Sequence, residues 1–385
     1  MLRGLYLANH NMADVNSGVT KKIRAQISAF ENLGCLMEEG MLFQDSTVDK
    51  IVRRMPVLSS YFDRESLGLA KSLLEADGLD FVYLRHGICD RYSIELLRYL
   101  HGNGVCTVIE FPTYPYDRNS SGLKWKLQLA KDKRWRLKMA PYVAFGTDYS
   151  GFEEIYGIPC MKLSNGIAAS RYTPRAEAPD PDRLITFIGV ALVTYWNGYD
   201  RLIRAMYQRK QSGAAGPRLR FNVVGDGEEM PNLRKLVEEL GMEDEVVFHG
   251  FLSGDALERV YEASDIGVGS LSPSRKYKGH MMSSLKTKEY AAVGLPFIKG
   301  DVDAAFDLGN CDFAFDVSDD EKPIDLAAII GWYQGLVAKE PAGELAHRIH
   351  SYSETYLSWE AQLAPVLDRV REYVACGQEC LHEQV

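Results

Sequence analysis

Short runs of β-branched and aromatic residues alternate along the whole chain with segments whose apolar residues recur at helical spacing. In the first half these runs are GLYLAN, FVYLRHG, CTVIEFP and YVAFGT, and in the second they are LITFIGV, RLRFNVVGDG, EVVFHGF and DIGVGSL. Strand-like runs separated by amphipathic helices are typical of βα units, which form parallel sheets. The pattern therefore predicts an α/β protein.

The pattern also predicts two helices in detail. After the first strand, apolar residues recur at helical spacing from Val19 to Phe30, and Gly34 ends the helix. Near the C-terminal end, the segment SWEAQLAPVLDRVREYVA begins with Trp359 and predicts a last helix. One apolar face of that helix is formed by Leu363, Val366, Leu367, Val370 and Val374.

The length of 385 residues favours two domains, because a single core rarely grows past roughly 250–300 residues. Residues 170–183 contain three prolines and several charges, which is typical of an extended, solvated connector. We expect a first Rossmann-like domain over 1–169 and a second over 184–350, with a terminal segment over 351–385.

The composition is that of an ordinary globular protein, with 46% hydrophobic and 25% charged residues. A net charge of −9 argues against binding to bulk nucleic acid. The longest apolar runs are far shorter than the ~20 residues needed to span a bilayer. Seven cysteines without paired spacing favour reduced thiols in a cytosolic protein, and we expect no metal site.

One segment is strongly basic although the whole chain is acidic. Residues 123–142 carry seven Lys or Arg against the single Asp132, with Trp125 and Trp135 interleaved. Such a segment can lie peripherally on an anionic membrane, with its tryptophans at the level of the headgroups. It can equally be a solvated helix whose Trp and Leu residues face the core of the protein, and the sequence leaves both interpretations open.

Ligands of open α/β sheets bind beyond the carboxyl ends of the strands. After the first strand, Asn16 or Ser17 can cap the next helix, and Gly18 allows a ligand to approach its N-terminus, where an anion is favoured. Lys22 adds positive charge nearby. A glycine in this position is also common as a simple cap, and neither GxGxxG nor a P-loop occurs, which lowers the expectation of NAD binding or ATP hydrolysis.

The second half repeats this arrangement. Gly189, Asn197 and Gly225 follow predicted strands, where they suit either a ligand or an ordinary turn. In the segment SSLKTKEYAAVGLPF, Ser283 and Ser284 are good helix caps, so that the following N–H groups point toward an anion such as a diphosphate.

Charged side chains around this helix start extend the hypothesis. Lys286, with Arg275 and Lys276 upstream, can neutralise a departing diphosphate, and the carboxylate of Glu289 can accept hydrogen bonds from a ribose diol. The alternative is that Glu289 forms a surface ion pair with Lys286 or Lys288, which is common and contributes little to stability.

These motifs together resemble family 4 of the retaining, nucleotide-sugar-dependent glycosyltransferases, in the branch that builds bacterial surface polysaccharides. The resemblance is carried by SGVTKKIRAQISAFENLG, EFPTYPYD, LSNGI, YWNGYDRLI, VVGDGEE, VVFHGFL, SSLKTKEYAAVGLPF and the Trp-led last helix. It implies the GT-B architecture, with two Rossmann-like domains that face each other across a cleft and a last helix that returns to the first domain.

The resemblance implies a nucleotide-sugar donor, commonly UDP-linked, in the second domain and the acceptor in the first. Residues 283–286 would carry the phosphates, Glu289 the ribose, and the backbone around Phe251 the base. The donor-binding residues would be Gly18, Gly189, Asn197, Gly225, Gly250, Phe251, Leu252, Ser283, Ser284, Leu285, Lys286 and Glu289. The acceptor side would hold Lys22, Arg85, Thr113 and Tyr114, with Glu110 as a candidate catalytic or acceptor contact.

Three positions depart from the family pattern. Met281 stands where the family often has a first glutamate that holds sugar hydroxyls, and Pro112 stands where it often has a histidine. A basic residue usual after the first strand of the second domain is missing, unless Arg275 or Lys276 substitutes for it.

The sequence predicts transfer of a hexosyl unit, with retention, from a nucleotide sugar to a glycan or lipid-linked saccharide. We expect no cofactor or metal, no nucleic acid, and a cytoplasmic location that includes the inner face of the plasma membrane. Two alternatives remain open. One is a non-catalytic partner subunit of another glycosyltransferase, and the other is a nucleotide-sugar epimerase.

Overall fold

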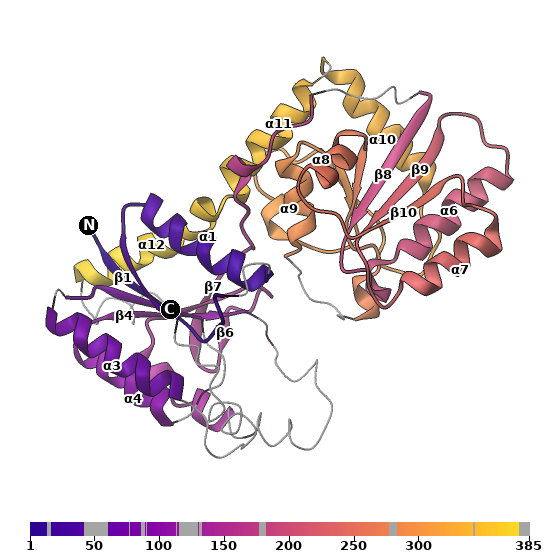
Figure 1. Cartoon of the computed structure of the whole chain (residues 1–385). Helices are drawn as coiled ribbons and strands as arrows, with labels where there is room; N and C mark the ends of the chain where they lie inside the picture. The colour runs from indigo at the N-terminus through magenta and orange to yellow at the C-terminus, as the bar shows by residue number, and fades with distance from the viewer. Residues whose placement is uncertain are drawn as a thin grey trace. The chain divides into compact units, whose positions relative to one another are not determined.

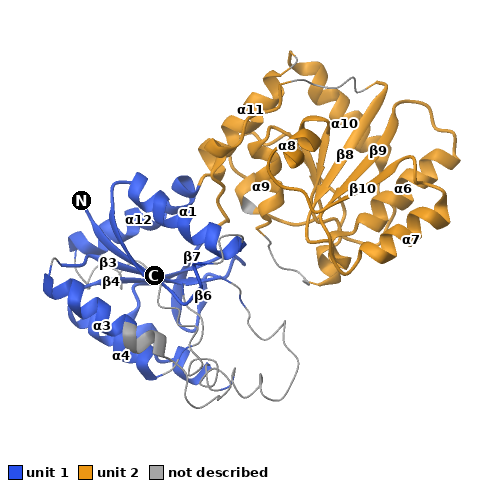
Figure 2. Ribbon diagram, viewed as in Figure 1, with its two compact units in different colours: residues 1–163, 359–385 blue, residues 164–358 orange. Residues whose placement is uncertain are grey.

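The computed structural model of the chain describes residues 1–13, 17–41, 61–76, 78–85, 89, 91–112, 114, 130, 133–176, 182–276, 283–341 and 343–376. The chain divides into two compact units (Figure 2). Unit 1 comprises Met1–Leu163 and Trp359–Val385, and unit 2 comprises Ser164–Ser358. The chain passes from unit 1 to unit 2 after Leu163, upstream of the proline-rich stretch 170–183. Asn165 already belongs to unit 2, because its backbone and side chain are hydrogen-bonded to Ser283.

Seven described strands form the sheet of unit 1, in the order β2-β1-β3-β4-β5-β7-β6. All neighbouring strands are parallel except β6 and β7. The strands are β1 (Arg3–Ala8), β2 (Leu36–Met41), β3 (Phe81–Arg85), β4 (Cys106–Phe111), β5 (Phe145–Asp148), β6 (Glu154–Ile155) and β7 (Ile158–Lys162).

Helices cover both faces of this sheet (Figure 1). Because successive strand residues point to opposite faces, Leu5 and Leu7 pack on the side of α3 (Tyr61–Ala76) and α4 (Arg91–Gly102). Tyr6 packs on the other side, with α1 (Gly18–Asn32) and α12 (Trp359–Cys376). The apolar face predicted for α12 is buried except at Val374, which is 39% exposed because it lies near the end of the helix.

The sheet of unit 2 has six described strands, all parallel, in the order β10-β9-β8-β11-β12-β13. These are β8 (Leu184–Val190), β9 (Arg218–Val224), β10 (Val246–Gly250), β11 (Ile266–Val268), β12 (Phe297–Lys299) and β13 (Ala314–Asp316).

Two groups of helices pack on this second sheet (Figure 1). Phe187 of β8 faces the core that contains residues of α6 (Tyr199–Gln211), α7 (Met230–Leu240) and α10 (Leu326–Lys339). Its neighbour Ile188 faces the core shared with α8 (Asp255–Glu262), α9 (Leu285–Ala292) and α11 (Glu344–Tyr352). Both units are therefore parallel-sheet α/β domains, as the sequence predicts, and the carboxyl ends of their strands are the places where ligands are expected.

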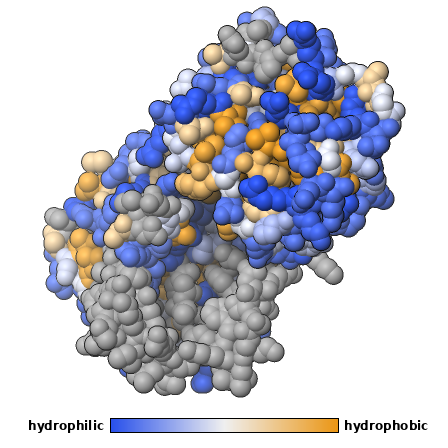
Figure 3. Space-filling view, turned by 45° about the vertical axis from the view of Figure 1, so that its right-hand side comes forward, coloured by the Kyte–Doolittle hydropathy of each residue, from blue (hydrophilic) through white to orange (hydrophobic). Residues whose placement is uncertain are grey.

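No described helix is both long and apolar enough to cross a membrane. On the face seen in Figure 3, the described surface is mostly hydrophilic, with hydrophobic patches between. Residues 123–129 and 131–132 of the basic segment 123–142, the candidate membrane surface, lie outside the described residues.

Candidate functional site

Polar side chains gather at the carboxyl ends of the unit 1 strands, around the buried Glu110 of β4. Lys22 Nζ, on α1, lies 3.1 Å from Glu110 Oε1, and the guanidinium of Arg85, at the end of β3, pairs with the same oxygen. The hydroxyl of Tyr149, just after β5, donates to it at 3.1 Å, and Gln26 donates to Oε2 at 3.3 Å. The Glu110 cluster consists of Tyr6, Lys22, Gln26, Arg85, Glu110 and Tyr149.

The electrostatics of this cluster stabilise an ionised glutamate. Burial raises the pKa of Glu110, but the charges of Lys22 and Arg85 outweigh burial and hold the pKa below its usual value. A general base needs an accessible lone pair and a pKa near the working pH. Glu110 is 0% exposed and already accepts from several donors. The geometry therefore argues against Glu110 as a general base. Its carboxylate instead holds the cationic groups of Lys22 and Arg85 in place.

The remaining unit 1 candidates lie around the first helix and the end of β4. The hydroxyl oxygen of Ser17 accepts from the Val19 N–H at 3.3 Å, so that Ser17 caps α1 as predicted. A Cβ on Gly18 would meet no atom within 4 Å, so packing does not require glycine there. The Tyr114 ring packs edge-on against Phe152, with centroids 4.9 Å apart. Asn16 and Thr113 lie outside the described residues.

In unit 2, helix α9 begins at Leu285 with Ser284 in the N-cap position, but no side chain caps it. The Ser283 hydroxyl accepts from the Asn165 N–H at 2.7 Å instead. Ser284 is therefore the N-cap residue, as predicted, but it makes no side-chain capping bond, and Ser283 holds the segment that enters unit 2 instead of capping the helix. The first N–H groups of a helix have no intrahelical partner, so this turn keeps donors for an anion.

Lys286, the second residue of α9, has a buried ammonium group. Its Nζ lies 5.8 Å from the centroid of the Tyr199 ring and has no hydrogen-bond partner among the described residues. The Tyr199 hydroxyl and both carboxylate oxygens of Asp301 are buried and equally unpartnered within the described part of the chain. Burial lowers the pKa of Lys286 to about 8, and the charge of Asp301 acts in the opposite direction. The Lys286 cluster consists of Tyr199, Lys286 and Asp301.

Glu289 lies one turn further along α9 and is half-buried. The Tyr261 hydroxyl donates to its Oε2 at 3.5 Å. Lys288 is fully buried and forms an ion pair with Asp303. Since Lys288 is paired elsewhere and the Lys286 ammonium is buried, the alternative of a surface ion pair between Glu289 and either lysine is wrong.

The two upstream cations have other partners. Arg275 donates to Glu321 from Nε and Nη2, at 2.9 and 2.7 Å, and to Asp200 from Nη1 and Nη2, at 2.7 and 3.0 Å. Its Nη1 also donates to a backbone carbonyl at 3.0 Å, so that all five guanidinium N–H groups are engaged. Lys276 Nζ lies 3.7 Å from the centroid of the Trp196 ring. The structure therefore argues against Arg275 as a free cation for a leaving group.

Close packing accounts for Gly189 and Gly225 at the ends of β8 and β9. A Cβ on Gly189 would come within 2.6 Å of the Tyr199 ring, and one on Gly225, whose φ is +119°, within 1.9 Å of the Ala191 carbonyl oxygen. Asn197 is buried, and its Oδ1 accepts from a backbone N–H of the same turn at 2.8 Å. These residues shape the loops above the sheet.

The segment proposed to meet the base follows β10. Gly250 is the last residue of the strand, Phe251 is 80% exposed, and Leu252 packs partly against the core. An exposed ring beside a strand end suits stacking on an aromatic base.

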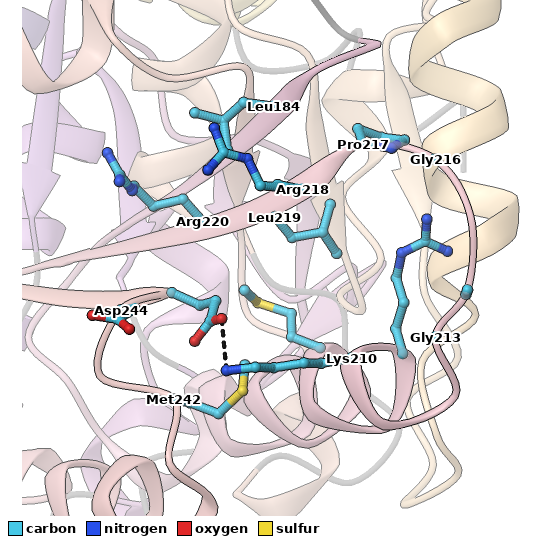
Figure 4. Close-up of a pocket in the computed structure, with 14 residues that line it drawn as sticks. Leu184, Lys210, Gly213, Gly216, Pro217, Arg218, Leu219, Arg220, Met242 and Asp244 are labelled. Carbon is cyan, nitrogen blue, oxygen red and sulfur yellow. Dashed lines mark ion pairs between the residues drawn. The ribbon is translucent and has the colours of Figure 1, made fainter.

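A pocket of about 310 Å³ lies at the amino-terminal ends of the strands in the unit 2 sheet (Figure 4). Leu184 and Arg218, which line it, are the first residues of β8 and β9. An ion pair of 2.8 Å joins two further lining residues, Lys210 and Glu245. The Lys286 cluster lies beyond the carboxyl ends of these parallel strands, at the opposite end of the sheet. The pocket is therefore not part of the candidate site.

Sequence reasoning missed Tyr199 and Asp301. Asp301 follows β12, a strand of only three residues, and the rule that ligands bind beyond strand ends applies to it as soon as that strand is recognised. Met281, at the position where the family that the sequence resembles often has a first glutamate, lies outside the described residues.

Comparisons with solved structures identify the fold. A glycosyltransferase from Rickettsia africae ESF-5 superimposes with a TM-score of 0.63 at 15% identity, over 97% of this chain and 99% of that one. Anabaena HepE, solved in complex with UDP, gives a TM-score of 0.57 at 13% identity, over 95% and 99%. This protein has the GT-B fold.

Sequence matches add to the GT-B assignment. Residues 182–330 match the profile of the family Glycosyl transferases group 1. A putative colanic acid biosynthesis glycosyltransferase of Escherichia coli (strain K12) is 27% identical over 231 residues, 59% of this chain and 50% of that protein. The chain spans half or less of the length of the curated relatives it matches. The family match contains the whole Lys286 cluster and none of the Glu110 cluster.

Proposed function

We propose that this GT-B protein transfers a hexosyl unit from a nucleotide sugar to a saccharide or lipid-linked saccharide. One observation carries the proposal. Within the segment that matches the group 1 glycosyl transferases, the first turn of α9 has no side-chain cap, and its second residue, Lys286, buries an ammonium group with no described partner. Helix N-termini and ammonium groups both favour anions, and a diphosphate interacts with both.

The donor is proposed to be UDP-linked. Anabaena HepE, which has the same fold, was solved with UDP. A carboxylate can accept two hydrogen bonds from a vicinal diol, and the half-buried Glu289 lies one turn from the proposed diphosphate. The exposed ring of Phe251 is the proposed platform for the base.

The proposed reaction proceeds with retention by front-face attack. The bond between the anomeric carbon and the donor phosphate breaks, and a bond to an acceptor hydroxyl oxygen forms. The departing phosphate accepts the proton of that hydroxyl, and the nucleoside diphosphate leaves. The saturation of Glu110 by its own partners supports a mechanism that needs no carboxylate base. Unit 1 is the proposed acceptor domain, and the relative named for colanic acid biosynthesis supports a role in polysaccharide synthesis. The proposed location is the cytoplasm, including the inner face of the plasma membrane.

No metal cofactor is proposed, because the dipole of α9 and the charge of Lys286 would balance the diphosphate. The expected result is that EDTA changes neither UDP binding nor turnover. Loss of binding in EDTA, restored by Mg²⁺, would contradict this part of the proposal.

Thermal unfolding with UDP and a panel of UDP-sugars tests the donor site. A ligand at about a hundredfold its Kd stabilises the native state by about 2.7 kcal/mol, which we expect to raise the melting temperature by several degrees. Lys286→Met should remove most of this shift. Lys235→Met is the matched control, because Lys235 is an exposed residue of α7 whose side chain is 74% accessible.

The outcomes separate the proposal from its alternatives. No shift with UDP, ADP or GDP would remove the donor site. Binding without turnover on any acceptor, followed by turnover when a second glycosyltransferase is added, would favour a partner subunit. An epimerised sugar in the absence of acceptor would favour an epimerase.

A further inference from the structure

Asn165 links the first residues of unit 2 to the start of α9. Its side-chain Nδ2 donates to the Ser283 carbonyl oxygen at 2.7 Å, and its backbone N–H donates to the Ser283 hydroxyl oxygen at 2.7 Å. The two residues are 118 positions apart in the sequence, and Ser283 immediately precedes Ser284, the N-cap residue of α9. These two bonds therefore fix the residue from which the chain enters the helix.

The bond to the carbonyl also fixes the direction of an N–H group. The Ser283 carbonyl and the Ser284 N–H belong to one planar peptide group, whose trans geometry points them in opposite directions. Because Asn165 holds the carbonyl on one side, the Ser284 N–H points to the other side. This N–H has no acceptor among the described residues, and it is one of the first N–H groups of α9, which have no intrahelical partner.

The backbone around Asn165 is held in place without its side chain. Ser164 Oγ donates to Asp303 Oδ1 at 3.0 Å, and the Ile167 N–H donates to the Leu357 carbonyl oxygen at 2.8 Å. The side-chain Oδ1 of Asn165 is buried without a partner in the described part of the chain, and such an acceptor costs stability. The amide side chain is therefore explained better by its bond to the helix start than by a role in anchoring this segment.

We propose that Asn165 is a positioning residue for donor binding, which holds the peptide group between Ser283 and Ser284 so that the Ser284 N–H can donate to the donor diphosphate. This inference rests on the proposed function, in which the diphosphate lies at the first turn of α9. The buried Lys286 ammonium, which has no partner among the described residues, belongs to the same turn. Asn165 acts through the peptide group and not by contact with the phosphates.

The experiment is a titration of the full chain with UDP and with uridine, followed by NMR, in the wild type and in Asn165→Ala. The variant loses the bond to the Ser283 carbonyl, so that the Ser284 N–H is no longer held toward the phosphates. We expect UDP to bind about fivefold more weakly, which is the effect of about one hydrogen bond. Uridine, which has no phosphate, should bind both proteins equally. The melting temperature without ligand should change little, because the backbone contacts of the segment remain.

A second variant removes the N–H group itself. Proline has no N–H and adopts a φ close to the −79° of Ser284, so Ser284→Pro should also weaken UDP binding. Adding Asn165→Ala to Ser284→Pro should then cause no further loss of UDP affinity, because both substitutions act on one interaction. Asn103→Ala is the matched control. Asn103 Nδ2 donates to the Tyr99 carbonyl oxygen at 2.8 Å in unit 1, and its loss should leave UDP affinity unchanged.

The alternative outcomes are distinct. Equal weakening of UDP and uridine by Asn165→Ala would show a merely structural role and overturn the inference. A further loss of UDP affinity when Asn165→Ala is added to Ser284→Pro would show that the side chain acts by another route, and would also overturn it. If the wild type binds UDP and Asn165→Ala binds it as tightly, this inference alone fails. If the wild type binds no nucleoside diphosphate, the proposed function fails with it.

Discussion

The Glu110 and Lys286 clusters occupy corresponding places in the two units, beyond the carboxyl ends of a parallel sheet, and both bury charge. In the first, Glu110 is bonded to Lys22 and Arg85, and further donors complete its two oxygens. In the second, the polar groups of Lys286 and Asp301 have no partner among the described residues. The same position in the fold thus carries a cluster whose charged groups pair with one another in one unit and an unpaired cluster in the other.

This difference separates scaffold from binding site. A buried charge is tolerated when other charges and hydrogen bonds compensate it, so the Glu110 cluster can be explained by the stability of unit 1 alone. The Lys286 cluster lowers stability unless something else completes it. Residues that lower stability are often retained because function needs them. Of the two clusters, the family match covers only the Lys286 cluster.

Glu110→Gln should have the largest effect on stability. It keeps the shape of the side chain but leaves the buried Lys22 and Arg85 without their anion, which should cost about 3–5 kcal/mol of the free energy of unfolding at pH 7. The pKa of Glu110 is lower in the folded state, so its contribution is present above the unfolded value of about 4.3 and is lost as the pH falls through the folded value. Urea unfolding of the wild type and the variant should therefore converge in acid.

Glu38→Gln, at an exposed position of β2, is the control and should change little. UDP should still raise the melting temperature of Glu110→Gln, because the proposed donor site belongs to unit 2. A variant that unfolds like the wild type but no longer transfers sugar would restore Glu110 as a catalytic residue and remove the distinction between the clusters.

Lys286→Met should change stability in the opposite direction. Burial lowers the pKa of Lys286 to about 8 from an unfolded value near 10.4, so the ammonium destabilises the fold fully below pH 8 and progressively less as the pH rises toward 10.4. We expect the variant to gain about 2 kcal/mol at pH 7 while it loses affinity for UDP.

Lys288→Met is the matched comparison, two residues away on the same helix. Lys288 has its partner in Asp303, so this substitution should destabilise unit 2. Urea unfolding at pH 7 and at pH 10 measures both. Equal destabilisation by the two substitutions would mean that Lys286 has a stabilising partner in the folded chain.

The sequence predicted the strands that are rich in β-branched and aromatic residues, because their burial and their propensity agree. It did not predict β2, where Glu38 and Glu39 are exposed on an edge strand and conceal the apolar pattern. The strands β12 and β13 have three residues each and are too short to show a period.

The site could be predicted only as separate residues. Arg275 was proposed as a free cation because its carboxylate partners, Asp200 and Glu321, are 75 and 46 positions away in the sequence. Lys22, Arg85 and Glu110 were each proposed, but nothing in their spacing indicated that both cations pair with the one carboxylate. Local patterns identify the residue types and the strand ends, whereas the pairing of charges depends on tertiary contacts.

Tyr199→Phe should have the smallest effect and tests the comparison at a single hydroxyl. The ring keeps its edge-on contact with Phe221, with centroids 5.3 Å apart, and only a buried hydroxyl without a described partner is removed. We expect a gain of about 0.5–1 kcal/mol in the free energy of unfolding. Tyr6→Phe is the matched control in the Glu110 cluster, where the hydroxyl donates to Gln26 Oε1 at 2.6 Å, and its loss should destabilise by about 1 kcal/mol. Urea unfolding of both variants decides the point. If Tyr199→Phe destabilises as much as Tyr6→Phe, the Tyr199 hydroxyl is satisfied in solution, and the two clusters differ less than their protein contacts indicate.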